Sequence, residues 1–203
     1  MNQLVIIDPG HGWGDAGAVR AGVSEAEITL GIGEYLYDDL KSRGQACLLT
    51  RGRRDQEKLA QRFGLFRRVQ IANQTPGAVC FVSLHLNSMP EEEGGAGIEI
   101  FYQAPSLKGI TLARSIETAY DLETVIRRRL PMVKPHADLY VLHKTRMPAV
   151  LIECGFISNI KEREFLNAKE GRQRMAQSLS AGIINWIHNK EVPSCRKLSP
   201  VSS

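Results

Sequence analysis

Short runs of apolar residues alternate along this chain with longer segments whose apolar positions recur at helical spacing. The clearest helical pattern covers residues 27–43, where Ile28, Ile32 and Leu36 fall on one face. Gly44 then supplies a stop signal. The strand-like runs are residues 4–7, 46–50, 79–84, 98–102, 139–142 and 149–152, and the helical segments are residues 27–43, 59–72, 107–130 and 161–189.

This order of elements predicts an α/β fold. Parallel strands need crossover connections and the usual crossover is a helix, so the alternation indicates a twisted, mostly parallel (mixed) sheet of about six strands with helices on both faces. We expect a single domain over residues 1–190 and a flexible C-terminal tail over residues 191–203, which are rich in Pro and Ser. Ligands of such sheets bind at the carboxyl ends of strands, so the residues that follow the strand runs are the candidates for a site.

The composition is that of an ordinary globular domain, with 203 residues of which 43% are hydrophobic. The net charge of +4 favours a polyanionic partner and leaves nucleic acid, anionic membrane and anionic cell wall open. No nucleic-acid recognition motif is visible, and no apolar run approaches the roughly 18 residues of a membrane span. We therefore expect neither a nucleic-acid partner nor a membrane span.

Cysteine spacing and the amino terminus bear on the compartment. The four cysteines form no C-x-x-C pair, and Cys47 and Cys80 lie in strand-like runs, which indicates buried free thiols rather than disulfides or a zinc finger. The first residues, MNQLVIIDPG, lack the basic start and the long apolar stretch of a signal peptide. We expect synthesis in the cytoplasm without a signal peptide.

Two histidines follow strand runs directly and would lie on the same edge of the sheet. His11 comes after residues 4–7, and His85 comes after residues 79–84. Imidazole is the commonest nitrogen ligand for zinc, and a catalytic zinc site uses three protein ligands. Glu25, at the end of the glycine-containing loop that starts beside His11, would supply a carboxylate, with Glu27 as its local rival. Long spacings of this kind are also compatible with two ordinary loop histidines.

A carboxylate at the end of the last strand run is harder to explain as a structural residue. Glu153 ends the apolar stretch PAVLIE, where an unpaired charge is costly and usually has a partner or a task. A nearby cation would meet that cost. Adjacent strand residues point to opposite faces of a sheet, so Cys154 cannot easily share a site with Glu153, and we assign it to the core.

Seven sequence blocks together resemble one known family. In chain order they are VIIDPGHGWGDAGA, SEAEITL, LLTR, RRVQIAN, FVSLHLN, GIEIFY and MPAVLIECGFISN, and they cover nearly everything from residue 4 to about residue 187. The chain is similar through them to the zinc-dependent N-acetylmuramoyl-L-alanine amidases of type 3, which are cell-wall hydrolases. DPGHG, SLHLN and LIECGFISN in this order are the most specific of the blocks.

The resemblance implies roles for particular residues. It places one zinc ion on His11, Glu25 and His85, because Glu25 opens the family's E-x-x-[I/L]-x-L stretch. It makes Glu153 the catalytic residue, which would take a proton from the attacking water and pass it to the departing amine. Asp8 and Asn87 also match the family and would be structural or neighbouring groups that orient the ligands.

The implied activity is hydrolysis of the amide bond between N-acetylmuramic acid and L-alanine in peptidoglycan. A zinc peptidase that cuts within the stem peptides would use the same residues. A catalytically silent wall-binding module is the other alternative, and the presence of every residue that the family needs argues against it. The resemblance is compatible with a phage endolysin that reaches the wall through a holin, and with part of an exported bacterial enzyme. In either case we expect a monomer that acts on the cell wall, with a muropeptide as its substrate.

Three features depart from the family pattern or stand outside it. Trp13 replaces a usual glycine and would either form a platform for a sugar or peptide or cover the core. His143 stands where another polar or basic residue is common. The basic run of residues 127–129, with Lys134, would be either a solvated face or a contact for carboxylates of the stem peptide.

Overall fold

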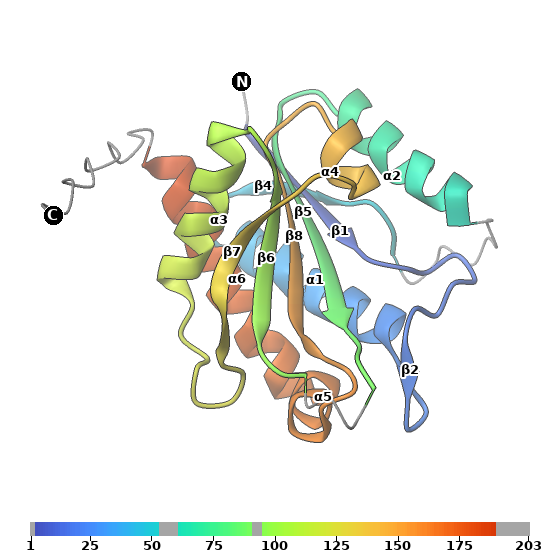
Figure 1. Ribbon diagram of the computed structural model, residues 1–203. Helices are drawn as coiled ribbons and strands as arrows, with labels where there is room; N and C mark the ends of the chain where they lie inside the picture. Colours follow the sequence, from blue (N-terminus) through green and yellow to red (C-terminus); the bar gives the residue numbers. More distant parts are fainter. Residues whose placement is uncertain (1–2, 53–60, 91–94, 190–203) are drawn as a thin grey trace, which may run out of the picture.

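The computed structural model describes residues 3–52, 61–90 and 95–189 and shows one six-stranded mixed sheet with helices on both faces (Figure 1). The strand order is β4-β1-β5-β8-β6-β7, in which β6 runs antiparallel to β8 and all other neighbours are parallel. The predicted α/β class is confirmed. The strands are β1 Leu4–Pro9, β2 Val19–Arg20, β3 Val23–Ser24, β4 Ala46–Leu49, β5 Ala78–Asn87, β6 Ile98–Gln103, β7 Arg128–His136 and β8 Ala149–Phe156, and the helices are α1 Glu25–Ser42, α2 Gln61–Gln74, α3 Leu107–Ala119, α4 Tyr140–Lys144, α5 Ile160–Asn167 and α6 Lys169–His188.

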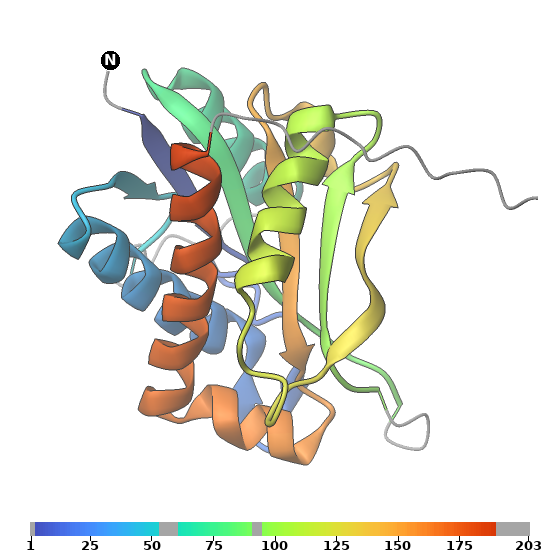
Figure 2. The same ribbon diagram turned by 90° about the vertical axis from the view of Figure 1, so that its left-hand side faces the viewer.

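Two hydrophobic cores fill the spaces on either side of the sheet. Helices α1, α3 and α6 pack on one face, where they can be followed in Figure 2, and α2 and α4 pack on the other. Successive strand residues alternate between the two cores: Val5 and Ile7 of β1 enter the larger core, whereas Ile6 enters the smaller one. Strands buried on both faces explain why these runs are continuously apolar.

The predicted helix over residues 107–130 was wrong beyond Ala119. The helix α3 ends there, and the chain returns as β7, an unpredicted edge strand that has β6 as its one partner among the described strands. Pro131 and Pro135 lie within β7, and proline is tolerated in edge strands because one side of the strand makes no ladder hydrogen bonds. The apolar residues around them mimic a helical period, but Pro131 disfavours the helical conformation at the residue before it.

The predicted strand over residues 139–142 was also wrong. This segment belongs to the short helix α4, which packs against α2 and buries Val141 and Leu142 in the smaller core. An apolar run of four residues does not by itself distinguish a strand from a buried turn of helix.

The last helical segment is divided in two. Helix α5 ends at Asn167 and α6 begins at Lys169, with Ala168 between them in extended conformation. Gly171 makes the sharp corner possible, because a Cβ built there would lie 1.8 Å from the carbonyl oxygen of Phe165. Any side chain at residue 171 would push the two helices apart.

Two further predictions concern single residue types and membrane spans. Cys47, Cys80 and Cys154 are buried free thiols, as expected, while Cys195 lies outside the described residues. Burial raises the pKa of the Cys80 thiol to about 12. Among the described helices, none is long and apolar enough to cross a membrane. Residues 190–203, which include the predicted tail, and residues 59 and 60 of the second predicted helix lie outside the described ranges.

Candidate metal centre and catalytic carboxylate

Three side chains with metal-binding atoms meet at the edge of the sheet where β1 and β5 end. His11 follows β1, Glu25 is the first residue of α1, and His85 lies within β5, which runs three residues further than the sequence pattern predicts. One nitrogen from each ring and one oxygen of Glu25 all lie within 4.8 Å of one another. Glu27 is exposed on the same helix and takes no part in this group.

The loop after β1 presents His11 in an uncommon backbone conformation. His11 has a φ of 60° and Trp13 a φ of 53°, both in the left-handed region. Gly10 is needed before them, because a Cβ there would lie 2.4 Å from the Cε1 atom of His85. The glycine of the DPGHG motif therefore lets the two histidine rings approach, with their centroids 4.9 Å apart.

Glu25 sits at the centre of the group and is almost fully buried. Its Oε1 lies 3.0 Å from Nε2 of His11 and 3.0 Å from Nδ1 of His85, and it also accepts a hydrogen bond from the backbone N–H of Leu86. Its Oε2 accepts from the N–H of Ala18. Burial alone would raise the pKa of Glu25, but the hydrogen bonds and charges of the two histidines outweigh it and hold the pKa well below its usual range.

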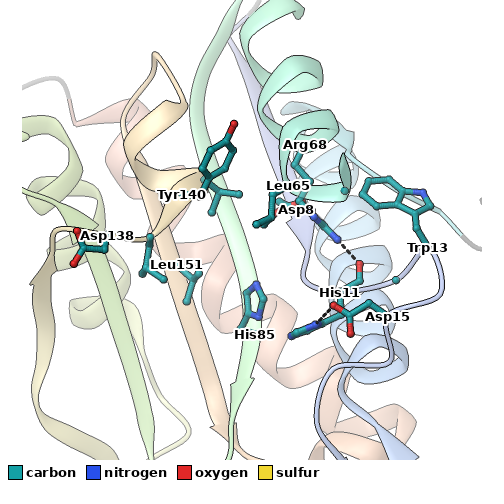
Figure 3. Close-up of a pocket in the computed structure, with 14 residues that line it drawn as sticks. Asp8, His11, Trp13, Asp15, Leu65, Arg68, His85, Asp138, Tyr140 and Leu151 are labelled. Carbon is teal, nitrogen blue, oxygen red and sulfur yellow. Dashed lines mark hydrogen bonds and ion pairs between the residues drawn. The ribbon is translucent and has the colours of Figure 1, made fainter. Parts of the chain in front are cut away.

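Asp15 orients His11, which the sequence did not predict. One carboxylate oxygen of Asp15 lies 2.9 Å from Nδ1 of His11, and the other accepts from the N–H of Gly17 (Figure 3). Burial would lower the pKa of His11, but Glu25 and Asp15 together raise it. A carboxylate on the far nitrogen of a ligating histidine fixes the orientation and tautomer of the ring, so Asp15 has the geometry of such a partner.

Glu153 lies beside this group on the neighbouring strand. It is directly opposite His85 in the parallel pairing of β5 and β8, so both side chains lie on the same face of the sheet. Its Oε2 is shielded from solvent and has no hydrogen-bond partner among the described residues. Burial, and then the charges of Glu25 and Glu99, raise the pKa of Glu153 to about 8. The next residue, Cys154, lies in the core on the opposite face, as predicted.

A network of buried charged and polar side chains contacts the loop after β1, which carries His11. Asp8 is fully buried and accepts hydrogen bonds from the hydroxyls of Thr50 and Ser83 and from the guanidinium of Arg68. Arg68, from α2, also donates to the carbonyl of His11 (Figure 3). Asp8 thus acts on the loop that carries His11 through Arg68, as a structural group that does not itself contact a ligand.

Arg51 ties the same loop to α1. Its guanidinium donates to the carbonyls of Pro9, Gly10 and Ala26 over distances of 2.8–2.9 Å. Asn87, the other residue predicted to orient the ligands, instead donates to the carboxylate of Glu99 at 3.1 Å. The sequence indicated no role for Arg51 or Arg68.

Trp13 lines a pocket of about 280 Å³ beside the histidines, together with Leu65, Tyr140 and Leu151 (Figure 3). Its ring is only 4% exposed and lies under the guanidinium of Arg68, 4.7 Å from ring centroid to Cζ. A ring that is covered in this way packs the loop against α2 and offers no open platform for a sugar. His143 is exposed on α4.

The chain is similar to known proteins over most of its length. The germination-specific N-acetylmuramoyl-L-alanine amidase of Bacillus subtilis (strain 168) is 28% identical over 94% of this chain and 82% of its own length. The endolysin of Bacillus phage SPP1 is 31% identical over 94% of this chain and 68% of its own length. The solved CwlD amidase from Clostridioides difficile, in complex with the GerS lipoprotein, is 30% identical with a TM-score of 0.80, and the match covers 92% of this chain and 98% of that one.

The family model described as N-acetylmuramoyl-L-alanine amidase matches residues 5–185. That range includes β5, β8 and all of β1 except its first residue, and it includes His11, Glu25 and His85. The resemblance inferred from the sequence is therefore confirmed, and the chain belongs to the N-acetylmuramoyl-L-alanine amidase family.

Proposed function

We propose that this protein hydrolyses the amide bond between N-acetylmuramic acid and L-alanine in peptidoglycan with the help of one zinc ion. The observation that supports it most is the meeting of His11, Glu25 and His85 beside Glu153 at one edge of the sheet. Membership of the amidase family supports the substrate and the bond. The cell wall is then the place of action, and the monomeric state stays a prediction.

The donor atoms fit zinc. Two imidazole nitrogens and one carboxylate oxygen form a three-ligand set of the kind that catalytic zinc sites use, and such a site leaves a fourth position for water or substrate. Oε1 of Glu25, which lies 3.0 Å from one nitrogen of each ring, would be the third ligand beside these two nitrogens. Asp15 on the far nitrogen of His11 completes the arrangement.

The chain's own residues would divide the chemistry as follows. When bound, zinc supplies a Lewis acid that polarises the scissile carbonyl and lowers the pKa of water. Glu153 takes a proton from the attacking water and delivers it to the nitrogen of L-alanine as the amide bond breaks. Burial raises the pKa of Glu153 above its ordinary value, so its carboxyl is able to hold the proton between the two steps. Arg68 and Arg51 hold the loop that carries His11.

Digestion of purified peptidoglycan with and without a chelator tests the proposal. We expect the protein to release stem peptides with a free amine on L-alanine, to lose this activity in the chelator, and to recover it when zinc is added back. Mass analysis of the fragments distinguishes the outcomes. Cuts inside the stem peptide would replace the amidase with a zinc peptidase, and no cuts would indicate a wall-binding module.

The choice of Glu25 over Glu27 as a ligand has its own test. Glu25→Gln is expected to lose at least about ten-fold in zinc affinity, because the anionic oxygen between the two rings is lost. Glu27→Gln removes the same charge from the exposed side of the same helix turn and should bind zinc like the wild type. The measurement is zinc content after gel filtration at several zinc concentrations, and equal losses in the two variants would refute the assignment.

A further inference from the structure

A second charged cluster continues the site across the sheet. Glu99, from β6, is directly opposite Glu153 in the antiparallel pairing of β6 and β8, so the two side chains share a face. Asn87, two residues after His85 on β5, donates to Oε2 of Glu99 and so connects the cluster to the histidine strand. In Figure 1, β5, β8, β6 and β7 lie side by side, with α2 and α4 near the top of the view, where α4 contacts β6 and β8.

The Glu99 cluster, which consists of Glu99, Arg129 and Lys134, has more positive than negative charge. Oε1 of Glu99 accepts a hydrogen bond from the ammonium of Lys134 and lies 3.2 Å from Nε of Arg129. Glu99 is buried, whereas the side chains of Arg129 and Lys134 are 37% and 28% exposed. One buried carboxylate thus binds two partly exposed cations. The cluster has a net charge of +1, and its positive groups are accessible to solvent.

Arg128, which precedes Arg129 in the basic run of residues 127–129, has different partners. Arg128 donates to the carbonyl of Tyr120 and forms an ion pair with Glu123, so its charge is balanced on the side of the loop after α3. Arg129 instead lies over the ring of Phe156, 5.2 Å from its centroid, which holds its guanidinium near the end of β8. The run at residues 127–129 is therefore no uniform solvated face, because its third member turns toward the site.

The spacing of strands indicates which part of a substrate would reach these cations. Lys134 belongs to β7, two strands from β8, but its ammonium reaches back to Glu99 on β6. It therefore lies about one strand spacing, roughly 5 Å, to the side of Glu153. An extended peptide advances roughly 3.5 Å per residue, so the second residue after the scissile bond lies about 7 Å away.

We propose that Lys134 and Arg129, held in place by Glu99, bind the free carboxylate of the second stem-peptide residue, the one after L-alanine. This specificity subsite rests on the proposed amidase function. It also sets the direction of the substrate, because the peptide then runs from Glu153 across β6 toward β7. The muramyl side of the scissile bond lies toward the pocket between α2 and α4.

Two muramyl tripeptides that differ only at the second residue test the subsite. One has the free α-carboxylate, and the other has the corresponding carboxamide. The wild type is expected to cleave the carboxylate form with a kcat/KM about ten-fold higher, as one charge-assisted hydrogen bond allows, mainly through a lower KM. Lys134→Met should reduce this ratio toward one.

Lys108→Met, which removes one exposed positive charge from α3, is the matched control and should keep the wild-type ratio. The double variant Glu99→Gln/Lys134→Met removes both charges of the Glu99–Lys134 ion pair and replaces Lys134→Met if the single variant does not fold. A ratio near one in the wild type, or an unchanged ratio in the Lys134 variants, would overturn the subsite and leave the amidase function standing. Failure of the wild type to cut either compound at the muramyl amide would overturn both.

Discussion

Glutamine in place of Glu153 is expected to remove nearly all hydrolysis of peptidoglycan, a loss of roughly 10²- to 10⁴-fold in kcat, and to leave the zinc content unchanged. Glutamine keeps the shape of the side chain but can neither accept nor deliver the proton. Glu153 is on β8, outside the group of His11, Glu25 and His85, so the ligands stay in place. The measurements are the rate of fragment release and zinc content by elemental analysis.

The same variant is expected to stabilise the zinc-free protein. The pKa of Glu153 is about 8 in the folded state against an ordinary value of 4.5, so the folded state binds this proton more tightly than the unfolded state does. The stability of the wild type relative to Glu153→Gln therefore falls as the pH rises from about 4.5, and the full penalty is present above about pH 8. At pH 7 we expect the variant to be more stable by roughly 3 kcal/mol, which corresponds to roughly 6–12 °C in Tm.

Glu164→Gln is the control, because it removes a carboxylate from the exposed surface of α5 and should change neither activity nor the pH dependence of Tm. Thermal melts of the three chelator-treated proteins between pH 4 and pH 9 compare them. An active Glu153→Gln enzyme would contradict the catalytic assignment. A variant that is inactive but no more stable than the wild type at pH 8 would contradict the raised pKa of Glu153 in the folded state.

Much of the fold was predictable because most of the strands are buried on both faces. The runs LVII of β1 and AVLI of β8 are wholly apolar, and Ser83 alone interrupts the run VCFVSL of β5, a pattern typical of a central strand or a buried helix. The edge strand β7 has a mixed composition with two prolines and two arginines, and only its pairing with β6 makes it a strand. The local pattern of apolar and polar residues contains no information on strand pairing, so β7 was missed. The short helix α4 was predicted as a strand because its apolar run is too short to show a helical period.

Some residues of the candidate site could also be predicted from the sequence, and others could not. His11 and His85 could be found because they come at or near the ends of buried strands, and Glu25 because the resemblance places it. The groups that hold them could not be found from the sequence. Arg68 reaches the carbonyl of His11 across 57 positions of the chain, and a hydrogen bond between a side chain and a distant backbone atom leaves no periodic signal. Asp15 is close to His11 in sequence, but its role depends on the left-handed turn between them.

The largest loss of stability is expected from Asp8→Asn. Burial would raise the pKa of Asp8, but Arg68, Thr50 and Ser83 lower it below its ordinary value of 3.8, so the carboxylate is ionised in the fold. Its stabilising effect is present above that value and is lost as the pH falls through the lowered pKa. Asparagine would leave the buried guanidinium of Arg68 without its counter-charge, at a cost of about 3–5 kcal/mol. The expected drop in Tm is roughly 10 °C, whereas Asp38→Asn on the exposed face of α1 should change Tm little.

A double-mutant cycle with Arg68→Met separates the role of this pair in the fold from its role at the metal. Asp8→Asn/Arg68→Met removes both charges, so its loss of stability should be clearly smaller than the sum of the two single losses, and additive losses would show that the pair does not interact. Zinc affinity should behave differently, because Arg68 also donates to the carbonyls of Pro9 and His11. We therefore expect the double variant to regain stability but not zinc affinity. Recovery of both would mean that the loop holds His11 in place without the arginine.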